Sequence, residues 1–203
     1  MAIDRVSLEE AERIIREAGD SVDIIEVGTS LIKEFGITRS IEGLKSRFPG
    51  RRLLADIKVM DEGAYEFGKT YEADADIATV MGVAAMATIE ACRDTARCFG
   101  MEYMIDLLET PDEKIRALAA FGDAIFCLHL PSDLAGEGLR ELVIREKILL
   151  NRSSRTAAAG GVTLESIPFL KQAGVDIAVV GSAITKNENI GRAAAAFADA
   201  VHE

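Results

Sequence analysis

The sequence of 203 residues predicts one α/β domain in which helices cover a parallel sheet. Three observations lead to this prediction. Short runs that are apolar almost throughout recur along the whole chain, segments with helical periodicity separate them, and no linker or low-complexity segment interrupts the alternation. Strands that are apolar on both faces are typical of parallel sheets buried beneath helices.

Seven apolar runs are clear, and an eighth strand is expected near the N-terminus. The clear runs span residues 22–27, 53–57, 77–81, 103–107, 124–128, 156–159 and 177–180, and residues 2–4 are the candidate for the eighth. Eight strands that alternate with helices predict a compact (β/α)8 barrel, a TIM barrel, over residues 1–203. An open doubly wound sheet is the alternative.

The starts of several helices can also be read. Ser7 and Glu10 have the spacing of a capping box, and apolar residues at helical intervals follow as far as Ala18. A proline in the first turn begins a second helix at residues 110–113, and a third helix is expected over residues 163–174. These segments fall between the apolar runs, as the barrel requires.

Residues 63–70 match the phosphate-binding pattern G-x-x-x-x-G-K-[ST] letter for letter. That pattern needs a strand before it and a helix directly after it, and only six residues separate Thr70 from the next apolar run. The stretch itself reads as a helix with Ala64, Phe67 and Tyr71 on one side. We therefore reject a P-loop NTPase.

Composition limits the possible partners and location. The net charge of −11 repels phosphate backbones, so we expect no nucleic-acid partner, whereas a few local donors can still bind one small phosphorylated ligand. The start of the chain lacks a signal-like region and no apolar run is long enough for a membrane span, so we expect a cytoplasmic protein. The three cysteines lack the spacing of a disulfide framework or a zinc ribbon.

In either architecture the ligand site lies at the carboxyl ends of the strands. The polar and glycine residues expected there are Asp4, Glu26, Asp56, Lys58, Asp61, Asp106, His129, Gly160, Gly161, Gly181 and Ser182. Acids and the histidine follow the first six strands, and glycines follow the last two. The sequence thus predicts side-chain chemistry on one side of the site and backbone donors on the other.

The acid–lysine–acid run Asp56, Lys58 and Asp61 is the most informative stretch. Asp56 and Lys58 are two apart in an extended segment, so they share a face. Such a run could bind a metal, hold a proton and polarise an oxygen, or it could be a structural ion pair. With Asp4 and Glu26, which could also be ordinary strand-end acids, it would form an oxygen-only cluster suited to Mg²⁺ or Mn²⁺.

His129 follows an apolar run and is either a catalytic group or a core histidine with its hydrogen bonds satisfied. The glycine pair Gly160-Gly161 and the Gly181-Ser182 pair each join a strand to a helix. Glycines there let backbone N–H groups approach an anion, which favours a phosphate site over plain turns. His202 is given no role.

With these residues in view, the sequence resembles the hexulose-6-phosphate synthases of the orotidine monophosphate decarboxylase group of barrels. The resemblance covers nearly the whole chain, and it rests on residues 26–29, 54–63, 106–112, 159–161 and 181–186. The strongest part, residues 54–63, matches the group's Asp-x-Lys-x-x-Asp signature. The related 3-keto-L-gulonate-6-phosphate decarboxylases share the scaffold and are the alternative.

The resemblance implies a Mg²⁺-dependent aldol reaction in which ribulose 5-phosphate loses a proton and the enediolate attacks formaldehyde. It implies that Glu26 and Asp56 hold the metal, that Lys58 stabilises the enediolate and that His129 moves the proton. Asp4 would contact substrate hydroxyls, and the phosphate would lie on Gly160, Gly161, Gly181 and Ser182. Asp61 would enter the site of a partner subunit, which implies a homodimer with shared active sites.

The sequence departs from its relatives after His129. Pro131 stands where relatives have glycine, and Ala135 stands where they have glutamine. Ser132 stands where the decarboxylases have arginine, which favours the aldolase over the decarboxylase. A phosphosugar-binding protein without activity is a third possibility, and the intact acid–lysine–acid run argues against it.

Overall fold

The computed structural model describes residues 1–134 and 138–202, and Ala135 lies outside the described residues. One sheet holds eight parallel strands in sequence order, so each strand pairs with the next along the chain. The strands are β1 (Ala2–Ile3), β2 (Ile24–Val27), β3 (Arg52–Val59), β4 (Ile77–Met81), β5 (Glu102–Asp106), β6 (Ile125–His129), β7 (Arg155–Ala159) and β8 (Ile177–Ala178). The amide of Ala2 donates to the carbonyl of Val180 at 2.9 Å, which joins the two ends of the sheet. The predicted (β/α)8 barrel is confirmed.

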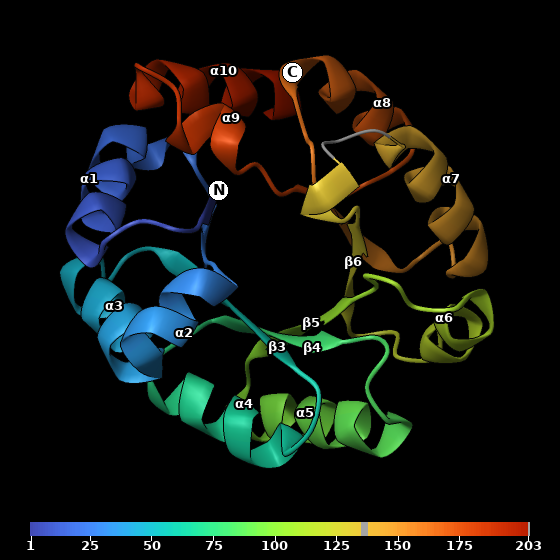
Figure 1. Cartoon of the computed structure of the whole chain (residues 1–203). Helices are drawn as coiled ribbons and strands as arrows, with labels where there is room; N and C mark the ends of the chain where they lie inside the picture. Colours follow the sequence, from blue (N-terminus) through green and yellow to red (C-terminus); the bar gives the residue numbers. More distant parts are fainter. Residues whose placement is uncertain (135–137, 203) are drawn as a thin grey trace.

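Helices form a ring outside the strands (Figure 1). They are α1 (Leu8–Ala18), α2 (Thr29–Ile37), α3 (Gly43–Arg47), α4 (Gly63–Glu72), α5 (Met86–Phe99), α6 (Asp112–Leu118), α7 (Leu139–Leu149), α8 (Ile167–Gln172), α9 (Ser182–Thr185) and α10 (Ile190–His202). Among the residues that the structure describes, none of these helices has the length and apolar character needed to cross a membrane.

Apolar side chains pack on both faces of the sheet, as the uninterrupted apolar runs predict. The large core lies between the strands and the helices. A smaller core fills the barrel interior and consists of Leu54, Ile77, Met104, Ile125, Cys127, Ala157 and Ala159. Apolar side chains thus fill the middle of the barrel, and polar groups lie at its two ends. Arg52 and Arg155 pair with Glu102 at the amino ends of the strands, and the acids and the histidine predicted from the sequence lie at the carboxyl ends.

The helix starts lie where the sequence signals place them, but Pro111 is the N-cap residue of α6 and precedes its first turn. The Ser7 hydroxyl accepts a hydrogen bond from the amide of Glu10 at 3.1 Å, whereas the Glu10 carboxylate pairs with Arg13 instead of closing the capping box. Thr163 and Ser166 form a complete capping box at the start of the segment that leads into α8. Such caps satisfy backbone N–H groups that have no partner within the helix.

Strand β3 carries a bulge next to the acid–lysine–acid run. Ala55 and Val59 are four positions apart but pair with Ala78 and Val80, which are two apart on β4. The extra pair of residues keeps the alternation of faces, so Lys58 remains on the same side as Asp56. Lys58 itself has a φ of 50°, a left-handed conformation that is uncommon outside glycine.

The segment that mimics a P-loop is helix α4, as expected from its periodicity. Phe67 and Tyr71 are buried, but Ala64 is exposed, so its predicted place on the buried side is wrong. Gly63 lies on the buried side of α4 instead, and a Cβ at this position would lie 2.7 Å from the Thr88 carbonyl oxygen on α5. The first glycine of the motif therefore serves close helix packing.

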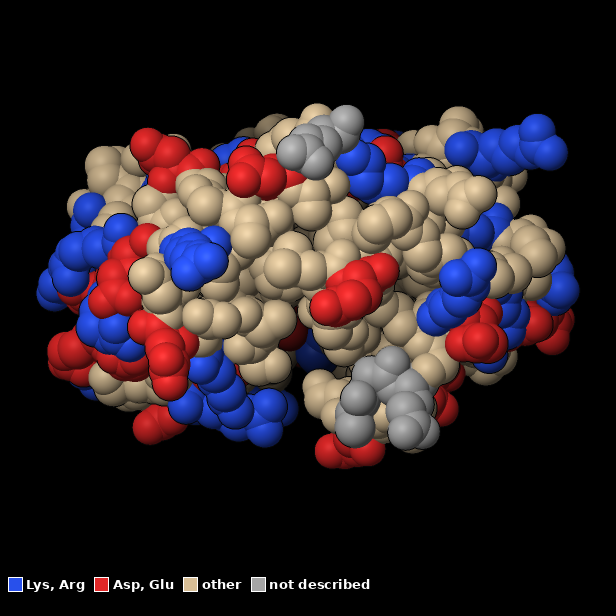
Figure 2. Space-filling view, turned by 90° about the horizontal axis from the view of Figure 1, so that it is seen from above, with Lys and Arg blue, Asp and Glu red and all other residues tan. Residues whose placement is uncertain are grey.

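Charged side chains are mixed on the face over α8, α9 and α10, which Figure 2 presents to the viewer. Lysine and arginine lie beside aspartate and glutamate toward the edges of this face, and uncharged residues occupy much of its centre. The excess of acidic residues is therefore not visible as one acidic surface on this side of the molecule.

Candidate functional site

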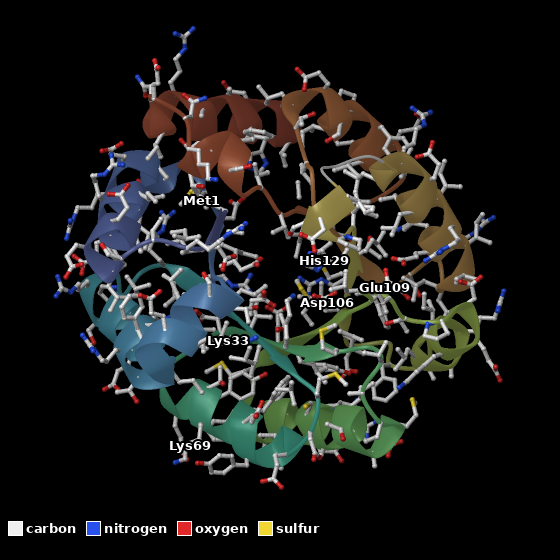
Figure 3. All side chains as sticks on the ribbon, in the orientation of Figure 1. Met1, Lys33, Lys69, Asp106, Glu109 and His129 are labelled. Atoms are coloured by element: carbon white, nitrogen blue, oxygen red, sulfur yellow. The ribbon has the colours of Figure 1, made fainter. Side chains whose placement is uncertain are left out.

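Polar side chains from five strands gather at the carboxyl end of the barrel. Asp56 and Lys58 come from β3, and Asp106 and His129 are the last residues of β5 and β6. Figure 3 shows Asp106 and His129 close together on the inner side of the barrel wall, whereas Lys69 points outward from the helical ring. Glu26 from β2 and Asp4, directly after β1, complete the set.

Asp106 is the centre of this network. Its Oδ2 lies 2.6 Å from Lys58 Nζ and 2.8 Å from His129 Nδ1, and its Oδ1 accepts the amide of Leu108 at 2.9 Å. Burial opposes ionisation of Asp106, but the hydrogen bond and charge of His129 and the charge of Lys58 outweigh it and lower its pKa to about 2. Asp106 is thus a fixed negative charge that orients two other groups.

Asp56 is held through both of its carboxylate oxygens. Oδ1 lies 3.1 Å from Lys58 Nζ and accepts the Thr79 hydroxyl at 3.0 Å, and Oδ2 accepts the Thr29 hydroxyl at 2.7 Å. Burial disfavours the ammonium of Lys58, yet the charges of Asp56 and Asp106 raise its pKa above the ordinary value. Lys58 is therefore a permanent cation between two carboxylates.

Thr79 also fixes the bulge in β3. Its hydroxyl accepts a hydrogen bond from the backbone amide of Lys58 at 2.9 Å while donating to Asp56. The side chain is buried, and the bulge moves this amide out of register with the backbone of β4. The Thr79 hydroxyl thus helps to position both Asp56 and Lys58.

Glu26 on β2 is a second carboxyl group close to Asp56. Burial and the neighbouring charge of Asp56 raise the pKa of Glu26 to about 8. Two nearby carboxyl groups with only oxygen donors fit a hard cation such as Mg²⁺, whose charge would relieve their repulsion. Glu26 and Asp56 are therefore the residues that could hold the metal predicted from the sequence.

Asp4 is fixed against the first turn of α2. Its Oδ1 accepts hydrogen bonds from the Ser30 amide at 3.1 Å and the Ser30 hydroxyl at 2.6 Å. Gly28 leaves the space for this contact, because a Cβ there would lie 2.1 Å from Asp4 Oδ2. Asp4 thus stands at the rim of the site in a set orientation.

Asp61 lies apart from this network. It follows β3, is exposed, and accepts a hydrogen bond from the amide of Glu62 at 2.8 Å. Its carboxylate is therefore free to meet solvent or another molecule, and the structure of one chain does not bring it to Lys58.

The glycine loops lie at the ends of β7 and β8. Gly160 and Gly161 have φ values of 86° and 71°, and a Cβ on Gly160 would lie 2.0 Å from the Leu130 carbonyl oxygen. Gly181 precedes the short helix α9, which begins at the exposed Ser182. Gly160 therefore allows close packing against Leu130, and the exposed Gly161 leaves its backbone accessible, as a phosphate site requires.

Sequence reasoning gave Asp106 no role, although it recognised this residue as a strand-end acid. It also gave Thr29 and Thr79 no role. Thr79 is the one polar residue in the apolar run 77–81, and that interruption was the available signal. The sequence signal for Thr29 is weaker. Thr29 is a hydroxyl residue just after the end of the strand that carries Glu26.

Comparisons with known proteins identify the family of the chain. Residues 1–197 match the family model described as orotidine 5'-phosphate decarboxylase / HUMPS family. A 3-hexulose-6-phosphate synthase of Bacillus subtilis is 34% identical over 190 residues, which cover 91% of this chain and 89% of the relative.

Two solved structures extend the comparison to the fold. A 3-hexulose-6-phosphate synthase from Salmonella typhimurium superimposes with a TM-score of 0.92 at 30% identity, covering 98% of this chain and 96% of the other. The structure of KGPDC from Streptococcus mutans in complex with D-R5P superimposes with a TM-score of 0.89 at 26% identity, covering 98% of this chain and 94% of the other. The chain therefore belongs to the orotidine 5'-phosphate decarboxylase / HUMPS family.

Proposed function

We propose that the protein is a carbon–carbon lyase that joins formaldehyde and ribulose 5-phosphate to give hexulose 6-phosphate. The observation that carries this proposal is the position of Lys58 between Asp56 and Asp106, with His129 on the same carboxylate. The names of its relatives support the same reaction. Sugar phosphates are retained inside cells by their charge, which favours a cytoplasmic location.

His129 is the proton carrier in this proposal. The tautomer that donates Nδ1–H to Asp106 leaves Nε2 with a free lone pair. Nε2 takes the proton from C1 of ribulose 5-phosphate, and the electron pair left behind forms the enediolate. C1 then forms a bond to the formaldehyde carbon, and the formaldehyde oxygen takes up a proton.

Lys58 stabilises the charge that appears after proton loss. Its ammonium is held by two carboxylates, so it needs no reorganisation when the enediolate forms. The pairing also keeps the lysine protonated, which excludes it as the base.

Magnesium is the cofactor in this proposal, and Glu26 and Asp56 hold it. When bound, it supplies a positive charge that polarises the substrate oxygens. Treatment with EDTA should abolish the activity, and added Mg²⁺ should restore it. Full activity in a metal-free preparation would remove the metal from the proposal.

The substrate is oriented from both sides of the mouth. Asp4 faces its hydroxyl groups, and the backbone amides around Gly160, Gly161, Gly181 and Ser182 hold its phosphate. The uncovered backbone of these loops supports this assignment.

The decarboxylation of 3-keto-L-gulonate 6-phosphate is the second candidate, because a 3-keto-L-gulonate-6-phosphate decarboxylase from Vibrio cholerae shares the fold at 26% identity. The experiment that separates the two is a screen of pentulose and ketohexonate phosphates with and without Mg²⁺. Formation of hexulose 6-phosphate from ribulose 5-phosphate and formaldehyde supports the aldolase. Release of CO₂ from the ketohexonate with no aldol product would replace it by the decarboxylase.

We further propose a homodimer in which Asp61 completes the site of its partner. Its exposed position beside the exposed apolar residues Met60 and Tyr65 supports this arrangement, because such side chains are common at subunit contacts. Mixing inactive Lys58→Ala and Asp61→Ala dimers should restore part of the activity, since one site of a heterodimer carries neither change. No recovery after verified subunit exchange would show that each chain builds its own site.

A further inference from the structure

A second set of possible metal ligands lies beside the oxygen pair Glu26 and Asp56. A carboxylate oxygen of Asp106, Sγ of Cys127 and a ring nitrogen of His129 all lie within 4.8 Å of one another. Cys127 is paired in register with Asp106 on the neighbouring strand, and His129 follows two residues later on the same face of β6. The three donors thus converge because of the strand register.

The donor types differ from those of the oxygen pair. Thiolate, imidazole and carboxylate together suit Zn²⁺ and similar soft cations, whereas Mg²⁺ prefers oxygen alone. Three protein ligands with a fourth position open to solvent are a common zinc geometry. His129 is only partly buried, so the open position would face the mouth of the barrel.

A cation at these donors would dismantle the proposed catalytic arrangement. Asp106 Oδ2 now accepts both Lys58 and His129, and the metal would take that oxygen and the ring nitrogen. Lys58 could leave, because its side chain is 24% exposed and its stem is flexible. His129 would stay in place as a metal ligand, and its ring could then no longer carry the substrate proton.

We propose that Asp106, Cys127 and His129 form an inhibitory site for a thiophilic divalent cation such as Zn²⁺. The cation replaces the thiol proton of Cys127, which is released to solvent, and it forms bonds to sulfur, nitrogen and oxygen. The inhibitory effect rests on the proposed function, but the binding site does not.

Binding can be tested with Co²⁺, which reports a bound thiolate by its charge-transfer absorption. With Mg²⁺ in excess throughout, the unaltered protein should show this absorption and Cys127→Ser should lose it. Cys98→Ser is the matched control, because Cys98 is an exposed cysteine on α5 and should leave the absorption unchanged. Equal absorption in Cys127→Ser would overturn the site even if the protein had no aldolase activity.

Inhibition is then measured by titrating Zn²⁺ into the aldol assay. We expect Cys127→Ser to need at least about tenfold more Zn²⁺ for half inhibition, since loss of one good metal ligand weakens binding strongly. Circular dichroism verifies the fold of each variant, and Cys127→Ala replaces the serine variant if that one fails to fold. The same half-inhibitory concentration in folded variants and unaltered protein would contradict the inhibitory role.

Discussion

The two sides of the barrel mouth work by opposite means. From β3 to β6 the site is made of charged side chains that hold one another through short contacts, with Asp106 at the centre. At β7 and β8 it is made of backbone that glycines leave uncovered. Function on the side of the charged side chains should therefore be lost when a side chain is shortened. Function on the side of the glycine loops should be lost when a side chain is introduced.

The largest effect on activity is expected from removing the Lys58 ammonium, which lies among the charged side chains. Lys58→Ala should lower kcat by ~10²–10³, because one preorganised charge contributes that much to transition-state stabilisation. Phosphosugar binding should weaken far less, since the glycine loops remain. Steady-state kinetics measure both quantities, and Lys69→Ala, an exposed lysine on α4, is the control. A loss confined to KM would contradict the assigned role of Lys58.

The second side is tested by adding atoms. Gly161→Val should raise KM by about 10–100-fold, because the side chain and the φ of 71° both disturb amides that donate to the phosphate. The effect on kcat should be smaller. Gly68→Ala, where a Cβ would meet open space, is the matched control. Normal binding of the phosphosugar to Gly161→Val would put the phosphate elsewhere.

A smaller loss on the first side should follow from Thr79→Val. This change removes the hydroxyl that joins Asp56 to the Lys58 amide but keeps the shape of the side chain. We expect kcat to fall about tenfold with KM nearly unchanged, as the loss of buried hydrogen bonds predicts. Thr79→Ser should recover most of the activity. Equal loss in both variants would indicate that packing, and not the hydroxyl, matters.

A further effect concerns the stability of the fold without metal, and not the turnover. Glu26 has a pKa of about 8 when folded and about 4.5 when unfolded, so the unfolded chain loses this proton first as pH rises. The free energy of unfolding should therefore decrease between pH 4.5 and pH 8 through this group. Urea midpoints in EDTA measure it, and Glu26→Gln should show a weaker decrease. The same slope in both proteins would contradict the raised pKa.

The comparison of the two sides also explains what could be predicted from the sequence. The positions of Lys58 and Asp56 followed from alternation, and the bulge in β3 preserved that prediction because it adds two residues. The glycines at residues 160 and 161 could be singled out because glycine adopts the positive φ values found there more readily than other residues.

The centre of the network was not predictable in the same way. Asp106 joins Lys58 and His129 across β5, and such a contact depends on strand register, which no local pattern in the sequence carries. Thr79 acts through a bulge whose existence is visible only in the pairing of β3 with β4. Long-range pairing, and not residue type, was the missing information.

The most direct test of the central claim is proton exchange at C1 of ribulose 5-phosphate in D₂O, followed by NMR without formaldehyde. The protein with Mg²⁺ should exchange one C1 proton for deuterium, and His129→Ala should exchange it far more slowly. Aldol product without any exchange at C1 would contradict proton transfer by His129, which Asp106 holds in place. Exchange in His129→Ala at the rate of the unaltered protein would contradict it as well.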